Sequence, residues 1–108
     1  MSRRKGVVSA VPVTETEWEG LIKELAGWLG YTYYHTWRSF HSPSGFPDCV
    51  LCRLEPEPRL VFAELKIEGN QPTIDQWAWL YILQQVGKPV EAYLWYPADF
   101  DEIKEVLR

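Results

Sequence analysis

A short, proline-containing polar segment between two apolar runs constrains the fold of this chain most strongly. Residues 50–52 (Val-Leu-Cys) and 60–63 (Leu-Val-Phe-Ala) are apolar, whereas residues 54–59 (Leu-Glu-Pro-Glu-Pro-Arg) are mostly polar and include two prolines. Apolar runs of this length are typical of strands, and proline-rich polar segments are typical of turns. The stretch therefore predicts a β-hairpin.

A hairpin that is roughly symmetric about Pro56 determines which residues face one another. Counting outward from this centre gives three pairs: Asp48 with Glu64, Val50 with Phe62, and Cys52 with Leu60. Opposed residues point to the same face of a sheet, so the Asp48 and Glu64 carboxylates meet, with their backbones about 5 Å apart. Lys66 follows two positions after Glu64, which places its ammonium on that face roughly 7 Å further along. Two acids and a lysine are expected to converge at the open end of the hairpin.

Such a pair of carboxylates predicts a metal site. Ionised carboxylates this close repel each other and are costly to remove from water, so they need water, a shared proton or a cation between them. Because all the available ligands are oxygens, the site favours Mg²⁺ or Mn²⁺ over zinc. The metal would polarise a phosphate oxygen and activate a water molecule, and Lys66 would orient that water or neutralise charge developing on phosphorus.

Three short motifs in this order resemble a known nuclease family. They are residues 45–48 (Gly-Phe-Pro-Asp), 63–66 (Ala-Glu-Leu-Lys) and 73–77 (Thr-Ile-Asp-Gln-Trp). The pattern resembles that of the PD-(D/E)xK nucleases and, more narrowly, the small stand-alone VRR-NUC domains, many of them phage-encoded and related in fold to Holliday-junction resolvases. The likeness runs from about Thr14 to about Glu102. It implies a restriction-endonuclease-like fold and Mg²⁺- or Mn²⁺-dependent cleavage of DNA, with branched or junction DNA as substrate.

The resemblance also implies roles for individual residues. Asp48 and Glu64 would bind Mg²⁺ with the backbone carbonyl of Leu65; Lys66 would position or activate the attacking water; Glu17 would bind a second ion or orient water; and Gln76 would steady Lys66 or the phosphate. Phosphate contacts are expected from Arg38 and from Arg4 and Lys5 in the basic N-terminal segment, for which a solvated terminus is the alternative.

Glu17 and Gln76 each have a structural alternative. The spacings Thr14-x-x-Glu17 and Thr73-x-x-Gln76 both fit a capping box, in which the third helical residue bonds back to the residue before the helix. Thr16-x-x-Glu19 would equally cap the first helix and leave Glu17 free for the site.

Hydrophobic periodicity gives the remaining elements. Helices are predicted over 14–29, from 73 to a stop at Gly87, and over 100–107; strands are predicted over 31–36 and 89–95 in addition to the hairpin. The order α-β-β-β-α-β-α indicates an α/β fold with a mixed central sheet flanked by helices. We expect the inward face of the second helix to consist of Ile74, Trp77, Leu80, Tyr81 and Val86.

Composition limits the class of protein. The chain has 108 residues, of which 46% are hydrophobic, so one small globular domain over 14–108 is expected, preceded by a flexible basic arm over 1–13. It has no apolar run of the ~20 residues that a membrane helix needs, and its N-terminus has no signal-peptide pattern, which predicts a cytoplasmic protein. Because one subunit offers a single site, symmetric cutting of two strands would need a homodimer.

The net charge of −4 argues against binding of nucleic acid by bulk electrostatics. Two alternatives to a nuclease therefore stay open: a non-cleaving nucleic-acid-binding module of the same fold, and a protein-interaction domain in which Glu64 and Lys66 form only a surface pair. Cys49 and Cys52 would point to opposite faces of a strand, so we interpret them as buried, inert thiols rather than a shared metal site.

The polar loop over 37–45 leads directly into the predicted site. Trp37, Phe40 or Phe46 would stack on an unpaired base, with a place in the core as the alternative for Trp37. His35 is interpreted as a structural histidine rather than a general base, and no motif supports His41.

Overall fold

The strand and helix patterns of the chain fold around one sheet. The computed structural model describes residues 13–37 and 40–108. The elements are α1 (Glu15–Trp28), β1 (Thr32–His35), β2 (Cys49–Arg53), β3 (Arg59–Leu65), α2 (Ile74–Val86), β4 (Val90–Trp95), the 3-10 turn η1 (Pro97–Asp99) and α3 (Phe100–Leu107). The order agrees with the predicted α-β-β-β-α-β-α. None of the helices in these ranges has the length and apolar composition that crossing a bilayer requires.

The sheet is mixed and has the strand order β1-β2-β3-β4 over the described residues. β1 and β3 each run antiparallel to β2, and β4 runs parallel to β3. The hairpin register has Val50 opposite Phe62 and Cys52 opposite Leu60. The predicted pairing of these two strands is therefore confirmed.

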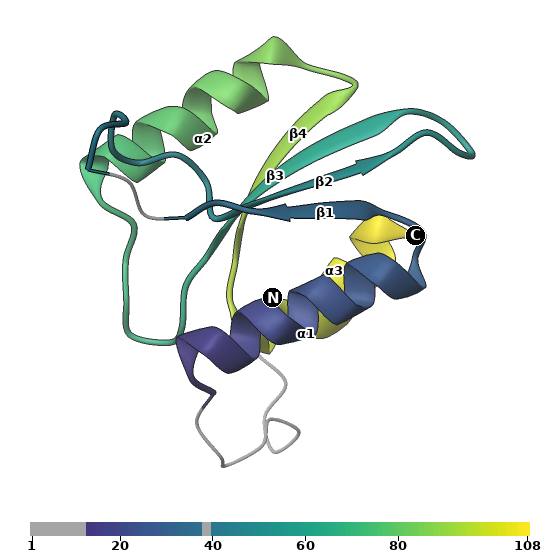
Figure 1. Cartoon of the computed structure of the whole chain (residues 1–108), viewed down its shortest axis with the longest axis horizontal. Helices are drawn as coiled ribbons and strands as arrows, with labels where there is room; N and C mark the ends of the chain where they lie inside the picture. The colour runs from purple at the N-terminus through teal and green to yellow at the C-terminus, as the bar shows by residue number, and fades with distance from the viewer. Residues whose placement is uncertain (1–12, 38–39) are drawn as a thin grey trace.

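Helices cover both faces of the sheet. α1 and α3 lie together on one side, and α2 lies on the other (Figure 1). Alternate residues of β3 point to the side of α1 and α3, where they form the main apolar core. This core contains Trp18, Ile22, Ala26, Leu51, Val61, Ala63, Ile103 and Leu107. The Trp18 indole N–H donates to the Trp95 carbonyl at 3.2 Å, so this polar group is satisfied inside the core.

The predicted inward face of α2 is wrong. Leu80 is buried as expected, but the exposed fractions of Ile74, Trp77, Tyr81 and Val86 are 86%, 48%, 63% and 63%. The helix is apolar on nearly every side, so periodicity alone does not determine which stripe faces the sheet. α2 packs through Leu80 and its neighbours and leaves most of its apolar side chains on the surface.

The two cysteines lie on opposite faces of β2, as predicted, but only one is buried. Cys49 is buried against the core, and Cys52 is exposed. Because α2 lies over the far half of this sheet face, nearer β4 than β2, Cys52 lacks the helix cover that a buried thiol would need. The prediction of two buried thiols therefore holds for Cys49 alone.

The loop before β2 is attached to the first turn of α2. The Ser44 hydroxyl donates a hydrogen bond to the Asp75 carboxylate. Gly45 has φ +95°, and a Cβ at this position would lie 2.6 Å from the backbone carbonyl carbon of Asp75. Glycine therefore allows both the left-handed backbone conformation and the close approach of the two segments.

Gly45→Ala is expected to lower the free energy of unfolding by clearly more than Gly69→Ala. Both glycines have positive φ, +95° and +92°, so alanine costs about 1–2 kcal/mol of backbone strain at either position. A Cβ at Gly69 meets no atom within 4 Å, whereas at Gly45 it collides with the backbone of Asp75. Urea unfolding of the two variants measures the difference, and equal losses of stability would contradict the close approach.

Candidate functional site

The three residues predicted to converge do so at one end of the sheet. Asp48 directly precedes β2, Glu64 lies near the end of β3, and Lys66 follows β3. The Asp48 Oδ2 atom accepts a hydrogen bond from the Leu65 backbone N–H at 2.8 Å. The Lys66 Nζ atom lies 3.7 Å from the Glu64 Oε2 atom. Two carboxyl groups and an ammonium thus form one cluster, which we call the carboxylate cluster.

Glu64 is the most unusual member of the carboxylate cluster. It is only 1% exposed, and its Oε1 atom is buried without a hydrogen-bond partner among the described residues. Burial, together with the neighbouring Asp48 carboxyl, raises the pKa of Glu64 to about 8, although the Lys66 ammonium opposes this shift. Near neutral pH this carboxyl therefore keeps a proton unless another positive charge replaces it.

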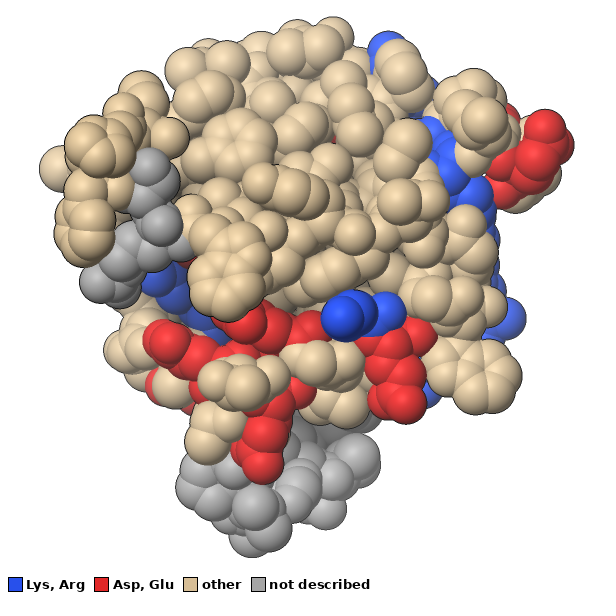
Figure 2. Space-filling model, viewed as in Figure 1, with Lys and Arg blue, Asp and Glu red and all other residues tan. Residues whose placement is uncertain are grey.

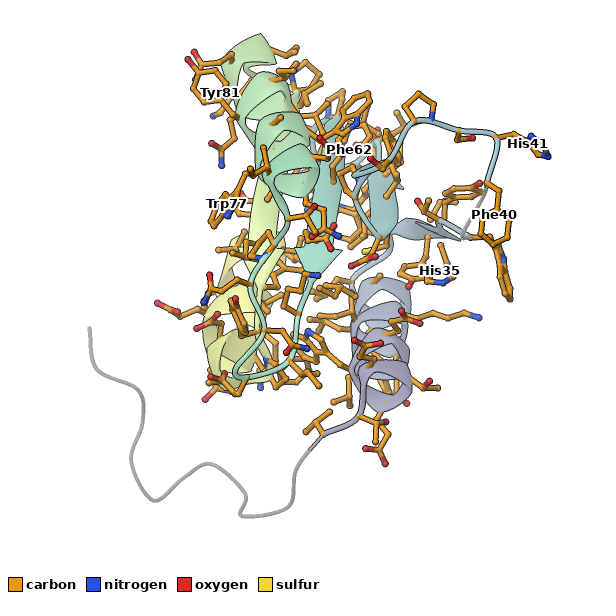
Figure 3. The ribbon with its side chains drawn as sticks, turned by 90° about the vertical axis from the view of Figure 1, so that its left-hand side faces the viewer. His35, Phe40, His41, Phe62, Trp77 and Tyr81 are labelled. Carbon is orange, nitrogen blue, oxygen red and sulfur yellow. The ribbon has the colours of Figure 1, made fainter. Side chains whose placement is uncertain are left out.

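Packing of residues 45–47 holds Asp48 in place. The Phe46 ring makes edge-on contacts with the rings of Phe62 and Trp79, at centroid distances of 5.9 Å and 5.0 Å. Figure 3 shows Phe62 between α2 and the sheet, where this contact forms. Pro47 is fully buried, and the Asp48 carbonyl accepts from the Thr36 backbone N–H at 2.8 Å. The Gly-Phe-Pro-Asp motif is thus a packed segment that ends in the site carboxylate.

Glu17 and Gln76 both form capping boxes. The Glu17 carboxylate accepts from the Thr14 backbone N–H at 3.0 Å, and the Thr14 hydroxyl accepts from the Glu17 N–H at 3.1 Å. The same pair of bonds joins Thr73 and Gln76 at 2.8 Å and 3.2 Å. The side chains predicted for the site are therefore occupied in caps, the structural alternative for both residues, because their spacing from a threonine satisfies free N–H groups of a helix start.

Glu19 is an α1 carboxylate close enough to Asp48 for their charges to interact, and the sequence prediction missed it. Its Oε1 atom lies 3.8 Å from His35 Nε2. Burial raises the pKa of Glu19, the nearby His35 lowers it, and the charge of Asp48 raises it further. The signal was present in the helix periodicity, since the buried Ile22 and Ala26 follow Glu19 at three and seven positions and so share its face.

The structure describes none of the three basic residues expected to contact phosphate. Arg38, Arg4 and Lys5 lie outside the described residues, as does most of the predicted basic arm.

The aromatic residues near the carboxylate cluster differ in how accessible they are. Trp37 is 80% exposed and Phe40 is 90% exposed, so a core position for Trp37 is ruled out. Phe40 and His41 project from the loop on the side of the molecule away from Trp77 and Tyr81 (Figure 3). Phe46 is packed between Phe62 and Trp79 and is not free to stack on a base.

The donor set of the carboxylate cluster is small. In the ranges 13–37 and 40–108, no group of three or more His, Cys, Asp or Glu side chains is arranged to hold a metal ion. The cluster offers two carboxylates and neighbouring backbone carbonyls. Acidic side chains also gather where α1 lies, on the face that Figure 2 shows. The site is thus oxygen-rich and surrounded by negative charge.

Comparisons with known proteins do not assign the chain to a family. No protein-family model matches the sequence, and neither a curated protein nor a solved structure matches it. The resemblance to VRR-NUC nucleases therefore stays a prediction that rests on the three motifs.

Stability of the metal-free protein is expected to fall as pH rises from about 4.5 to about 8. The pKa of Glu64 in the folded protein, about 8, exceeds its ordinary value of 4.5, so the folded state binds the extra proton and loses that advantage as pH rises through this window. Urea unfolding in EDTA across this pH range measures the effect.

Glu64→Gln keeps the shape of the side chain but cannot ionise. This variant should therefore show a smaller fall in the free energy of unfolding as pH rises. Glu102→Gln, at an exposed position, serves as the matched control and should retain the full decline. An equal decline in both variants would show that another group is responsible.

Proposed function

We propose that this chain is a metal-dependent endonuclease that hydrolyses phosphodiester bonds in DNA. The observation that carries the proposal is the Oε1 atom of Glu64, which is buried without a hydrogen-bond partner among residues 13–37 and 40–108 and lies in a cluster with Asp48 and Lys66. A buried carboxylate oxygen without a partner is costly unless a proton or cation neutralises it. This arrangement is what a cation site requires and what a surface ion pair would not need.

The donors present fit Mg²⁺ or Mn²⁺. Mg²⁺ is commonly held by one or two carboxylates and keeps several waters, so two carboxylates and the Leu65 carbonyl are a sufficient protein contribution. Asp48 and Glu64 would hold the ion, and Glu19 replaces Glu17 as the candidate for a second ion or for orienting water. When bound, such an ion polarises a phosphoryl oxygen and lowers the pKa of a coordinated water.

The residues of the chain supply orientation and charge. The Leu65 N–H donates to Asp48 Oδ2, which restricts the rotation of this carboxylate. The Lys66 ammonium, close to Glu64, would orient the attacking water and stabilise negative charge developing on phosphorus. Gln76 caps α2 in this structure by accepting from the Thr73 backbone N–H. Its proposed second role is to give up this bond and hydrogen-bond to the substrate phosphate instead.

The arrangement of elements supports the finer assignment to a restriction-endonuclease-like fold of the VRR-NUC type. The paired acids lie at the ends of two antiparallel central strands, and β4 adds in parallel to the strand that carries Glu-x-Lys. The exposed rings of Trp37 and Phe40 support a substrate with unpaired bases, such as branched or junction DNA, because base stacking needs accessible aromatic faces.

Cleavage should require a divalent ion and the carboxylate cluster. Purified protein is expected to cut branched and single-stranded DNA in Mg²⁺ or Mn²⁺ and not in EDTA. Asp48→Ala and Lys66→Ala should each reduce the rate by about 100-fold or more, as the loss of one preorganised charged group does elsewhere. Gel assays of labelled DNA measure this. Metal-independent cutting would remove the mechanism, and binding without cutting under every metal condition would favour the non-cleaving module.

Glu17 and Glu19 should have opposite phenotypes. Glu17→Ala removes the capping box and is expected to lower the free energy of unfolding by about 1 kcal/mol while leaving the specific cleavage rate unchanged. Glu19→Gln removes the charge that faces Asp48 and should reduce cleavage with little loss of stability. Thermal unfolding and single-turnover cleavage, measured on both variants, separate the two roles. A cleavage defect confined to Glu17→Ala would restore Glu17 as the site residue.

A further inference from the structure

An apolar stripe runs along the outer side of α2. Ile74 is followed at three, four, seven and eight positions by Trp77, Ala78, Tyr81 and Ile82, so these residues share one face of the helix. All five are exposed, and the exposed fractions of Ile74 and Ile82 are 86% and 55%. Figure 3 shows Trp77 and Tyr81 on the same side of α2, opposite to the side on which Phe62 lies. We call these five residues the α2 stripe.

The α2 stripe carries no charge, although the protein as a whole is acidic. Residues 76–87 contain no Asp, Glu, Lys or Arg, whereas the whole chain has a net charge of −4. A helix that is apolar on its outer side as well as its inner side is normally covered by another structure. Without Lys or Arg the stripe would not attract nucleic acid, and it offers no charge complementarity to an acidic or basic protein.

The order of side-chain sizes in the stripe fits a second copy of the same helix. Ala78 lies at the centre and lets two helices approach closely, and a larger apolar residue lies four positions away on each side, Ile74 and Ile82. Around a two-fold axis at Ala78, antiparallel helices would place Ala78 against itself and Ile74 of one copy opposite Ile82 of the other. The antiparallel arrangement also brings opposite ends of the two helix dipoles together.

The exposed area of the α2 stripe is enough for a small interface between two copies. The four large side chains of the stripe offer on the order of 500 Å² per copy, given that an aromatic side chain buries about 150–250 Å², whereas a standard interface takes about 800 Å² per partner. We propose that the chain forms a two-fold homodimer through the α2 stripe, with Ala78 at the axis. This inference does not depend on nuclease activity.

Analytical ultracentrifugation of the full chain from about 1 to about 200 µM tests the dimer. Mass is expected to rise from monomer to dimer across this range. Ala78→Glu places two carboxylates at the axis and should keep the protein monomeric throughout. Val106→Glu introduces the same charge at an exposed apolar position on α3 and should dimerise like the natural sequence. Circular dichroism confirms that each variant is folded. A natural sequence that stays monomeric at the highest concentration would overturn the proposal.

A charge-swap experiment tests the position of the axis. Ala78→Glu and Ala78→Lys should each be monomeric alone, because like charges would meet, and a mixture of the two should form heterodimers that weaken as salt increases. Heterodimers in the mixture support self-contact at position 78. Two variants that stay monomeric when mixed, or that dimerise alone as strongly as the natural sequence, would contradict it.

Discussion

The pairing register of β2 with β3 is the constraint on which the candidate site depends. Side chains alternate between the two faces of a sheet, so a slip of one residue would move Val61 and Ala63 out of the core and turn Phe62 and Glu64 into it. Apolar burial on the side of α1 and α3 therefore determines the register. The same register brings Asp48 and Glu64 together on the opposite side, so the site is a consequence of core packing.

The burial of a carboxyl group in this site lowers the stability of the folded protein when that group is ionised. Burial of Glu64 opposes its ionisation, and Asp48 adds to this effect, while Lys66 offsets it only in part. The groups around Glu64 are fixed by their own contacts. Asp48 accepts a hydrogen bond from the Leu65 N–H, and Phe46 packs between Phe62 and Trp79. In the metal centre proposed above, a bound cation would neutralise this carboxyl and remove the cost of its ionisation.

Sequence reasoning succeeded where one physical signal dominated and failed where two signals coincided. The hairpin was predictable because apolar alternation and a proline-rich turn agree on its centre. The roles of Glu17 and Gln76 were ambiguous, because a capping box and a site residue occupy the same helix-start position, and only the bonds to Thr14 and Thr73 distinguish them. The stripe of α2 that faces the sheet could not be predicted, since a helix that is apolar on nearly every side gives no clear preference for one face.

α2 links the two proposals through its first turn. Asp75 accepts from Ser44, and its backbone is in close contact with Gly45, three residues before Asp48. Ile74, the first residue of the outer stripe, is the neighbour of Asp75 in the same turn. A contact that restrains the start of α2 would therefore also restrain the loop that positions the Asp48 carboxylate. In the proposed nuclease the Asp48 carboxylate would need a defined position, so a dimer contact on the α2 stripe would also help to hold that carboxylate in place.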